Sequence, residues 1–288
     1  MIDISKSNIT IVGLGLIGGT YAEAIKSLNP KNLWAIDIDE ESLDYAEEKG
    51  IIDKGFTDRE VPLSNSDIVI MAVYPELTKQ FIRESMDYFK LGAIITDSAG
   101  IKESLIEEIN SMLRDDLDFI GGHPMAGRET SGVKSASAEI FKGANYIITP
   151  NDRNKEENID IVKDLARKIG FKNVVKIDPR KHDEIIAFTS QLPHVIAITL
   201  MNCNHIENVN SFTGGSFNDV TRIAKINPSL WSELMIENSE HMINQIDIFQ
   251  NYMTSIKDAI KDGNYSALND ILKESNKRKE EQTEYVQS

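Results

Sequence analysis

The chain has 288 residues and a formal net charge of −15, from 31 Lys and Arg against 46 Asp and Glu. So acidic a protein disfavours nucleic acid as a partner, because nucleic-acid binders need basic surface that displaces counterions. A single cysteine, Cys203, excludes an intrachain disulfide and a cysteine metal cluster. No run approaches the roughly eighteen apolar residues needed to cross a bilayer, and the N-terminus shows no secretory signal. We therefore expect a cytoplasmic protein with no metal site and no membrane partner.

Short apolar runs alternate with helix-length segments through residues 1–179. Several runs are apolar throughout, which is typical of strands covered on both faces. This alternation predicts an α/β fold with a Rossmann-like, doubly wound and largely parallel sheet. The predicted strands are 8–14, 33–37, 67–73, 93–97, 118–122, 145–149 and 173–178, and the predicted helices between them include 40–49, 75–90, 101–114 and 155–169.

The stretch GLGLIGG at residues 13–19 fits the pattern Gly-x-Gly-x-x-Gly. A lone match is weak, but this one follows a strand and opens a helix at the start of a βαβ unit, which is the context of dinucleotide binding. Its glycines permit a tight turn and let a pyrophosphate approach the backbone, while the helix N-terminus faces the phosphates. An ordinary strand–helix turn is the less favoured alternative.

Asp37 ends the second predicted strand, where a carboxylate accepts hydrogen bonds from the adenosine ribose hydroxyls. A ribose phosphate would meet like charge there, and no arginine directly follows, so the sequence favours NAD over NADP. A helix-capping role suits Asp39 better than Asp37. The residues expected to bind the cofactor are Gly13, Gly15, Leu16, Ile17, Gly18 and Asp37.

The stretch GGHPMAGRETSG at residues 121–132 places one imidazole, His123, in a glycine-rich loop after the strand at 118–122. Ligands bind at the carboxyl edge of open α/β sheets, and titratable groups with functional roles gather there. A neutral imidazole can take a hydroxyl proton while hydride leaves the same carbon. We favour this role for His123 over that of a core histidine.

Residues 180–288 are predicted to be all-α. The segment 182–203 is apolar around much of its circumference, as in a buried helix. Asn227 and Pro228 fit the start of another helix, whose apolar stripe continues to a stop at Gly263, a length of about 35 residues or roughly 50 Å. A helix so long outgrows a small domain, so we expect a shared helical interface in a homodimer. The charged C-terminal tail is expected to fray.

Two segments of the helical half carry candidate site residues. Pro193 is expected to kink the apolar helix beside His194, which either serves a site or hydrogen-bonds the broken backbone. Arg222 can grip a carboxylate with a bidentate fork that Asp219, three residues back, can orient. The alternative for this pair is an ion pair on a solvated helix. No role is assigned to His182, His205 and His241.

In this order, the motifs resemble the prephenate dehydrogenase family of tyrosine biosynthesis over nearly the whole chain. The glycine loop is shared by many dehydrogenases. The His-Pro loop at His123, the Leu-Pro-His kink at His194 and the Asp-x-x-Thr-Arg segment ending at Arg222 are far more specific together. The resemblance implies oxidative decarboxylation of prephenate to 4-hydroxyphenylpyruvate with reduction of NAD. It also implies a nucleotide-binding domain, 1–179, followed by a helical substrate and dimerisation domain, 180–288.

The resemblance implies roles for individual side chains as well. His123 matches the residue that hydrogen-bonds the ring hydroxyl of the substrate and assists hydride transfer. His194 matches a histidine that lines the substrate pocket, and Arg222 matches the arginine that binds a substrate carboxylate. Asp219 matches an acidic residue near that arginine, and Glu129 matches a glutamate at the mouth of the pocket.

One loop departs from the family pattern. Where many members have Asp-x-Gly-Ser-x-Lys, this chain reads DSAGIK at residues 97–102, with Gly100 at the usual serine position. The serine that helps to orient the catalytic imidazole is therefore absent, replaced by Ser98, or replaced by water. Ser98 is kept as a catalytic candidate with His123 and His194.

Three other functions stay open. Arogenate dehydrogenase has the same chemistry on an amino acid side chain, and the sequence does not identify the pocket group that separates the two substrates. A 3-hydroxyacid dehydrogenase is expected to carry a lysine where this chain offers His194. A non-catalytic NAD-binding sensor would bind dinucleotide without turnover. Prephenate carries two carboxylates, so an acidic protein needs a local cation, for which Arg222 is the leading candidate.

Overall fold

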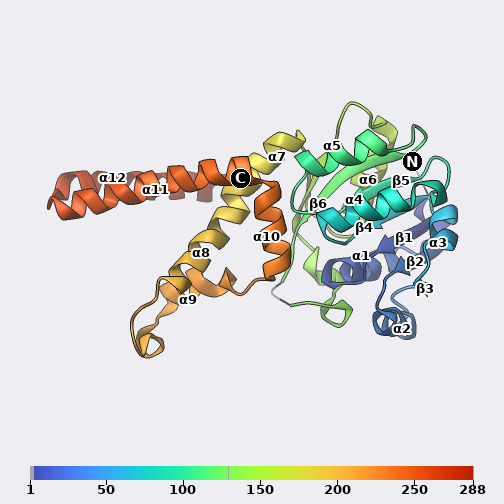
Figure 1. Cartoon of the computed structure of the whole chain (residues 1–288), viewed down its shortest axis with the longest axis horizontal. Helices are drawn as coiled ribbons and strands as arrows, with labels where there is room; N and C mark the ends of the chain where they lie inside the picture. Colours follow the sequence, from blue (N-terminus) through green and yellow to red (C-terminus); the bar gives the residue numbers. More distant parts are fainter. Residues whose placement is uncertain (1–2, 129, 288) are drawn as a thin grey trace. The chain divides into compact units, whose positions relative to one another are not determined.

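The computed structural model of the chain describes residues 3–128 and 130–287. It divides into two compact units, Met1–Asn238 and Ser239–Ser288. The first unit contains the whole sheet and the helices up to α10, and the second consists of two long helices (Figure 1).

An eight-stranded sheet forms the centre of the first unit, with strands β1 (Asn8–Val12), β2 (Asn32–Ile36), β3 (Lys54–Phe56), β4 (Ile68–Met71), β5 (Ile94–Asp97), β6 (Asp118–Met125), β7 (Asn145–Thr149) and β8 (Asn173–Lys176). Their order in the sheet is β3-β2-β1-β4-β5-β6-β7-β8. All neighbours are parallel except β6 and β7, which are antiparallel. The strand order reverses between β1 and β4, so a ligand crevice is expected at the carboxyl ends of these strands. The predicted doubly wound α/β fold is confirmed.

The central strands are apolar along their length because helices cover both faces of the sheet. In β1, Ile9 and Ile11 point into one apolar cluster, and Val12 points into the other. The helices of this unit are α1 (Leu16–Lys26), α2 (Glu40–Glu48), α3 (Glu60–Asn65), α4 (Pro75–Glu84), α5 (Glu103–Met112), α6 (Glu156–Lys168), α7 (Pro179–Ile186), α8 (Leu192–Asn202), α9 (Gly215–Thr221) and α10 (Pro228–Glu237).

Helices α7 and α8 are joined by a π-helical turn at Ala187–Gln191. This turn lies just before Pro193, where the sequence predicted a kink. The changed hydrogen-bond pattern of the π-helical turn accommodates a proline, which has no N–H to donate. The expectation of a buried helix is wrong for the single chain, because Phe188 is 60% exposed and Met201 46% exposed. By length and mean hydropathy Pro179–Asn202 could cross a bilayer, although the core helices of soluble proteins pass the same test.

The prediction of one long helix from Asn227 to Gly263 is wrong. Helix α10 ends at Glu237, and Asn238 leaves helical geometry with φ −104° and ψ 27°. The Asn238 amide donates hydrogen bonds to the Asp183 carbonyl (3.0 Å) and to Gln191 Oε1 (2.8 Å), which holds the residue in the first unit. The chain then begins α11 at Ser239.

The second unit consists of α11 (Ser239–Lys261) and α12 (Tyr265–Gln287), which pack against each other. Gly263 has a φ of +61°, so it makes the left-handed turn that ends α11, as the sequence predicted. The tail predicted to fray is part of α12 instead, because the turn at Gly263 pairs it with a preceding helix.

Candidate active site

The glycine loop lies between β1 and α1 and is shaped by close backbone contacts. Gly13 has a φ of +92°, and a Cβ on it would lie 2.6 Å from Val73 Cγ1. A Cβ on Gly18 would lie only 1.8 Å from the carbonyl oxygen of Gly13, so any larger residue would force the helix away from the loop. These two positions need glycine for the turn and for helix–strand packing, as the sequence predicted.

The surface in front of the loop is open. A Cβ on Gly15 would meet no atom within 4 Å. Gly15 is the N-cap of α1 and Leu16 and Ile17 form its first turn, with no side-chain cap hydrogen bond in the described structure. Open space before uncapped N–H groups at a helix N-terminus fits the pyrophosphate of a dinucleotide.

Asp37 follows β2 and holds the glycine loop in place. Its Oδ2 accepts a hydrogen bond from the Leu14 N–H at 2.6 Å, and its Oδ1 accepts one from the Asp39 N–H at 2.9 Å. A carboxylate has about four acceptor sites, so capacity remains for ribose hydroxyls. Asp39 occupies the N-cap position of α2, but its side chain accepts from the Ser42 hydroxyl at 2.6 Å and makes no cap hydrogen bond to the helix backbone.

His123 lies within β6 rather than in a loop after it. The strand extends to Met125, and His123 pairs with Ile147 of the antiparallel strand β7. The strand is longer than predicted because the antiparallel β7 gives the residues after Gly122 a partner. The imidazole therefore stands on a hydrogen-bonded strand inside the sheet, between β5 and β7, which fixes its backbone.

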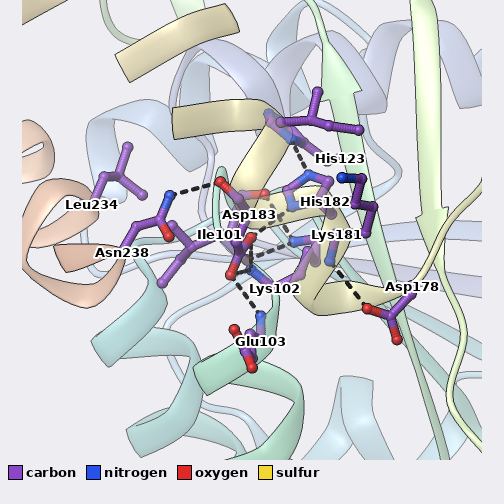
Figure 2. A network of polar contacts seen from close by, with 12 residues as sticks. Ile101, Lys102, Glu103, His123, Asp178, Lys181, His182, Asp183, Leu234 and Asn238 are labelled. Carbon is purple, nitrogen blue, oxygen red and sulfur yellow. Dashed lines mark hydrogen bonds and ion pairs between the residues drawn. The ribbon is translucent and has the colours of Figure 1, made fainter. Parts of the chain in front are cut away.

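His123, which is half-buried, begins a series of hydrogen bonds that reaches into α7 (Figure 2). Its Nδ1 lies 2.9 Å from His182 Nε2, and His182 Nδ1 lies 2.7 Å from Asp183 Oδ1. His182 is 1% exposed and Asp183 is 3% exposed. Neither His182 nor Asp183 was predicted as a site residue from the sequence, although both lie on the stripe of α7 that carries the buried Ile186.

The Asp183 carboxylate is held by the N-terminus of α5. Its Oδ1 accepts from the Lys102 N–H at 2.8 Å, and its Oδ2 accepts from the Glu103 N–H at 2.8 Å (Figure 2). These groups are free for such a bond because the first turn of a helix has no internal partner for its N–H groups. A negative charge is also favoured at this end of the helix dipole.

The loop from β5 to α5 is fixed by a buried ion pair. Lys102 Nζ lies 2.6 Å from Asp97 Oδ2 and also donates to the carbonyls of Ala99 (2.8 Å) and Ile101 (3.1 Å). Asp97 Oδ1 accepts from the Gly122 N–H at 2.9 Å, next to His123. All three ammonium protons are thus used, and the loop is tied to β6.

The surroundings of His123 and His182 keep both imidazole rings neutral. Burial lowers the pKa of His123 well below its ordinary value, and the nearby His182 and the Lys102 cation act in the same direction. Burial also lowers the pKa of His182, since the opposing effect of Asp183 is smaller. A neutral His123 has one ring nitrogen with a lone pair and can accept a proton.

In the loop from β5 to α5, Gly100 rather than Ser98 lies near the His123 ring. The Ser98 hydroxyl donates to the Met71 carbonyl at 3.3 Å. Gly100 is the residue near His123 Nε2, since a Cβ on it would lie 4.0 Å from that nitrogen and 3.5 Å from Leu234 Cδ1. The recorded partner of the imidazole is therefore His182, rather than Ser98 as the sequence allowed.

Helix α10 connects this site to the segment of Arg222. Its Leu234 lies near Gly100, while its Trp231 packs on His194, with ring centroids 3.7 Å apart. His194 Nδ1 lies 2.9 Å from the Ile223 carbonyl, so the ring hydrogen-bonds this neighbouring segment.

Two of the remaining predicted residues belong to the same stretch of sequence as Ile223. Arg222, the residue before Ile223, and Asp219 are both exposed. Glu129 lies outside the described residues.

Comparison with known proteins gives matches over most of the chain. The model of the prephenate dehydrogenase nucleotide-binding domain matches residues 21–175, and that of the prephenate dehydrogenase dimerization domain matches residues 178–274. A prephenate dehydrogenase of Bacillus subtilis is 32% identical over 84% of this chain and 67% of its own length. A cyclohexadienyl dehydrogenase of Zymomonas mobilis is 30% identical over 94% of both chains.

A solved structure is also similar in fold and sequence. The crystal structure of prephenate dehydrogenase from A. aeolicus, in complex with hydroxyphenyl propionate and NAD+, has a TM-score of 0.87. It is 28% identical, and the match covers 96% of this chain and 98% of that one.

Proposed function

This chain belongs to the prephenate dehydrogenase family, and from that starting point we propose that it converts prephenate to 4-hydroxyphenylpyruvate with NAD as the hydride acceptor. The observation that carries the proposal is the state of His123. Its Nδ1 is engaged by His182 while Nε2 lies on the side of Gly100, and burial lowers its pKa. A neutral imidazole held in this way suits a general base.

The proposed reaction balances without any further reagent. A nicotinamide held at the glycine loop would supply the acceptor for the hydride that leaves the hydroxyl-bearing carbon. His123 takes the hydroxyl proton. The bond to the ring carboxylate then breaks, its electron pair aromatises the ring, and carbon dioxide leaves. His123 returns its proton to the oxygen, which is now phenolic, so the imidazole ends the cycle neutral.

Prephenate is the first candidate for the substrate because relatives that match most of this chain are named prephenate dehydrogenase, including those of Bacillus subtilis and Lactococcus lactis. Arogenate is the second candidate, since a relative similar over 94% of both chains is named cyclohexadienyl dehydrogenase, without reference to one side chain. Both substrates share the ring on which His123 would act.

NAD is the proposed cofactor because of Asp37. Its carboxylate lies at the edge of the glycine loop, where it would accept hydrogen bonds from the ribose hydroxyls and repel a ribose phosphate. The backbone at Gly13, Gly15 and Gly18 would hold the pyrophosphate with the N–H groups of Leu16 and Ile17. These residues do not depend on which cyclohexadienyl substrate is used.

The helical half is proposed to bind the substrate carboxylates. Arg222 would pair with one of them, Asp219 would orient the guanidinium, and His194 would line the pocket on the face opposite Trp231. Glu129 is proposed at the pocket mouth. Ser98 stays a candidate only through a movement of its loop, since its hydroxyl is bonded to Met71.

The proposed assembly is a homodimer in the cytoplasm. The second matched model describes a dimerization domain, and large apolar side chains of this half, such as Phe188, Phe212 and Ile236, are exposed in the single chain. A second copy would cover such surface. We propose residues 1–179 as the nucleotide-binding domain and 180–288 as the substrate and dimerisation domain.

A paired assay tests the proposal. The purified protein would be given prephenate or arogenate, each with NAD+ or NADP+, while formation of the reduced cofactor is followed by absorbance. We expect the highest kcat/KM with prephenate and NAD+. Faster turnover of arogenate would overturn the substrate, and faster turnover with NADP+ would overturn the reading of Asp37. Dinucleotide binding without turnover of either substrate would show a sensor.

A further inference from the structure

We propose that His182 and Asp183 are positioning residues that fix the tautomer of His123, with the proton on Nδ1 and the lone pair on Nε2 toward the substrate hydroxyl. This inference rests on the proposed role of His123 as the base. It goes beyond that role because it assigns two further residues and a direction of hydrogen bonding to a site that has glycine at position 100.

The direction is set first at Asp183. Its oxygens accept hydrogen bonds from the backbone N–H groups of Lys102 and Glu103 at the start of α5. Because backbone N–H groups point at both oxygens, neither oxygen has a proton to donate to His182. The proton between Asp183 Oδ1 and His182 Nδ1 therefore belongs to the imidazole, which donates at 2.7 Å.

The tautomer of His182 then sets the direction of its hydrogen bond with His123. A neutral imidazole carries one N–H, and here that N–H is on Nδ1, so Nε2 is an acceptor. His123 Nδ1, 2.9 Å from that acceptor, must therefore be the donor. The lone pair of His123 is left on Nε2. The lowered pKa of His182 supports the neutral ring that this step requires.

The bond to His182 matters for the orientation of the His123 ring because residue 100 is a glycine. A Cβ on Gly100 would lie 4.0 Å from His123 Nε2, and glycine has no hydroxyl with which to hold the ring from that side. Among the residues that the structure describes, the hydrogen bond recorded for the His123 ring is the one to His182. The ring is therefore oriented from its Nδ1 side.

The same chain can stabilise the protonated base. When Nε2 takes the substrate proton, the imidazolium keeps its Nδ1 bond to His182, behind which lies the Asp183 carboxylate. The other charges beside this chain are Lys102 and Asp97, which neutralise each other at 2.6 Å. Asp183 is thus the negative charge left to offset the imidazolium.

The Asp183→Asn variant tests the direction of the bonds. Only at the Oδ2 place can its amide oxygen accept from both backbone donors, the Glu103 N–H at 2.8 Å and the Lys102 N–H at 3.1 Å in the parent, and the NH2 group then faces His182 Nδ1. The amide then donates, His182 carries its proton on Nε2, and His123 must accept at Nδ1. The proton of His123 moves to Nε2, and the base loses its lone pair there. In a comparable enzyme triad this kind of substitution lowers kcat about 10⁴-fold.

Two substitutions of His182 separate tautomer from packing. In His182→Gln the amide oxygen can accept from His123 Nδ1, whereas in His182→Phe a somewhat larger aromatic ring has no polar atom. We expect the Gln variant to keep kcat within about tenfold of the parent and the Phe variant to lose about 10²-fold or more, the range of a disabled acid–base group. A role in packing alone would predict the reverse or no difference. His205→Gln, at an exposed position, is the matched control.

The tautomers are read directly by ¹⁵N NMR of the histidine-labelled full chain, which has five histidines to assign. We expect His123 with its proton on Nδ1 in the parent and on Nε2 in Asp183→Asn. A proton on Nε2 in the parent, or an unchanged kcat in both Asp183→Asn and His182→Phe, would overturn the inference. Absence of turnover in the parent with prephenate and arogenate would overturn the proposed function alone, since the NMR result needs no turnover.

Discussion

Substitution of His123 by asparagine should remove the base and keep its surroundings. The asparagine Nδ2 occupies the place of the imidazole Nδ1, so it can still donate to His182 Nε2, the contact that is 2.9 Å long in the parent. The atom that disappears is Nε2, the proposed acceptor of the substrate proton. Loss of a general base lowers the rate about 10²–10⁴-fold, or about 3–5 kcal/mol in the activation barrier.

The matched control is His123→Gln, whose amide lies farther from the backbone, near the position of Nε2. This variant should lose the bond to His182 and leave the buried Nε2 of that ring unpaired, at a cost of about 1–3 kcal/mol in the free energy of unfolding. Thermal unfolding should therefore separate the two variants. Steady-state formation of NADH should show that both variants lose turnover. The Kd for NAD+ should show that both keep cofactor binding. A kcat of His123→Asn close to that of the parent would refute the reasoning.

Four further measurements test the substrate cation, the glycine loop and the neutral state of His123. Arg222→Ala should raise KM for prephenate about 10–100-fold, from the loss of charge-assisted hydrogen bonds worth about 1.5–3 kcal/mol, and an unchanged KM would exclude Arg222 from the site. Gly18→Ala should abolish dinucleotide binding measured by calorimetry, because its Cβ would lie 1.8 Å from the Gly13 carbonyl oxygen, and normal affinity would contradict the loop geometry. Since the pKa of His123 is lowered, neutral base persists below pH 6.5, and kcat/KM should fall only at lower pH. As the pH falls, the unfolded chain protonates His123 before the folded chain does. The free energy of unfolding should therefore decrease as the pH falls below about 6.5. A denaturant titration that shows no such decrease would count against a neutral His123 ring in the folded protein.

The sheet was predictable because its strands are short, apolar and bounded by helix signals. Strand β3, Lys54–Phe56, was missed since three residues with one glycine at a sheet edge carry no periodic pattern. The antiparallel extension of β6 was missed because its pairing with β7 depends on a residue far along the chain.

The helical half was predictable in type but less so in its boundaries. The apolar stripe skips Asn238 with one step of eight residues, from Leu234 to Met242. Periodicity alone could not show that the Asn238 amide would bond to Asp183 and Gln191 and that the helix would end there. The burial of the apolar helix Pro179–Asn202 could not be predicted from one chain, because a second copy of the chain is the partner we propose for its exposed side.

In the candidate site, the motif residues were identifiable and their supporting residues were not. Gly13, Gly18 and Asp37 carry their spacing in the sequence. His182 and Asp183 have no motif, and their link to His123 arises only when α7 packs against β6 and α5. Their one signal is burial on the face of α7 that also carries Ile186.

A crystal structure of the chain with prephenate and NADH would test the central claim most directly, because this mixture lacks the oxidised cofactor and cannot react. The account predicts the ring hydroxyl of prephenate at hydrogen-bond distance, about 3 Å, from His123 Nε2, with a carboxylate of the same molecule paired to Arg222. A hydroxyl bound elsewhere, or a guanidinium that contacts no part of prephenate, would contradict it.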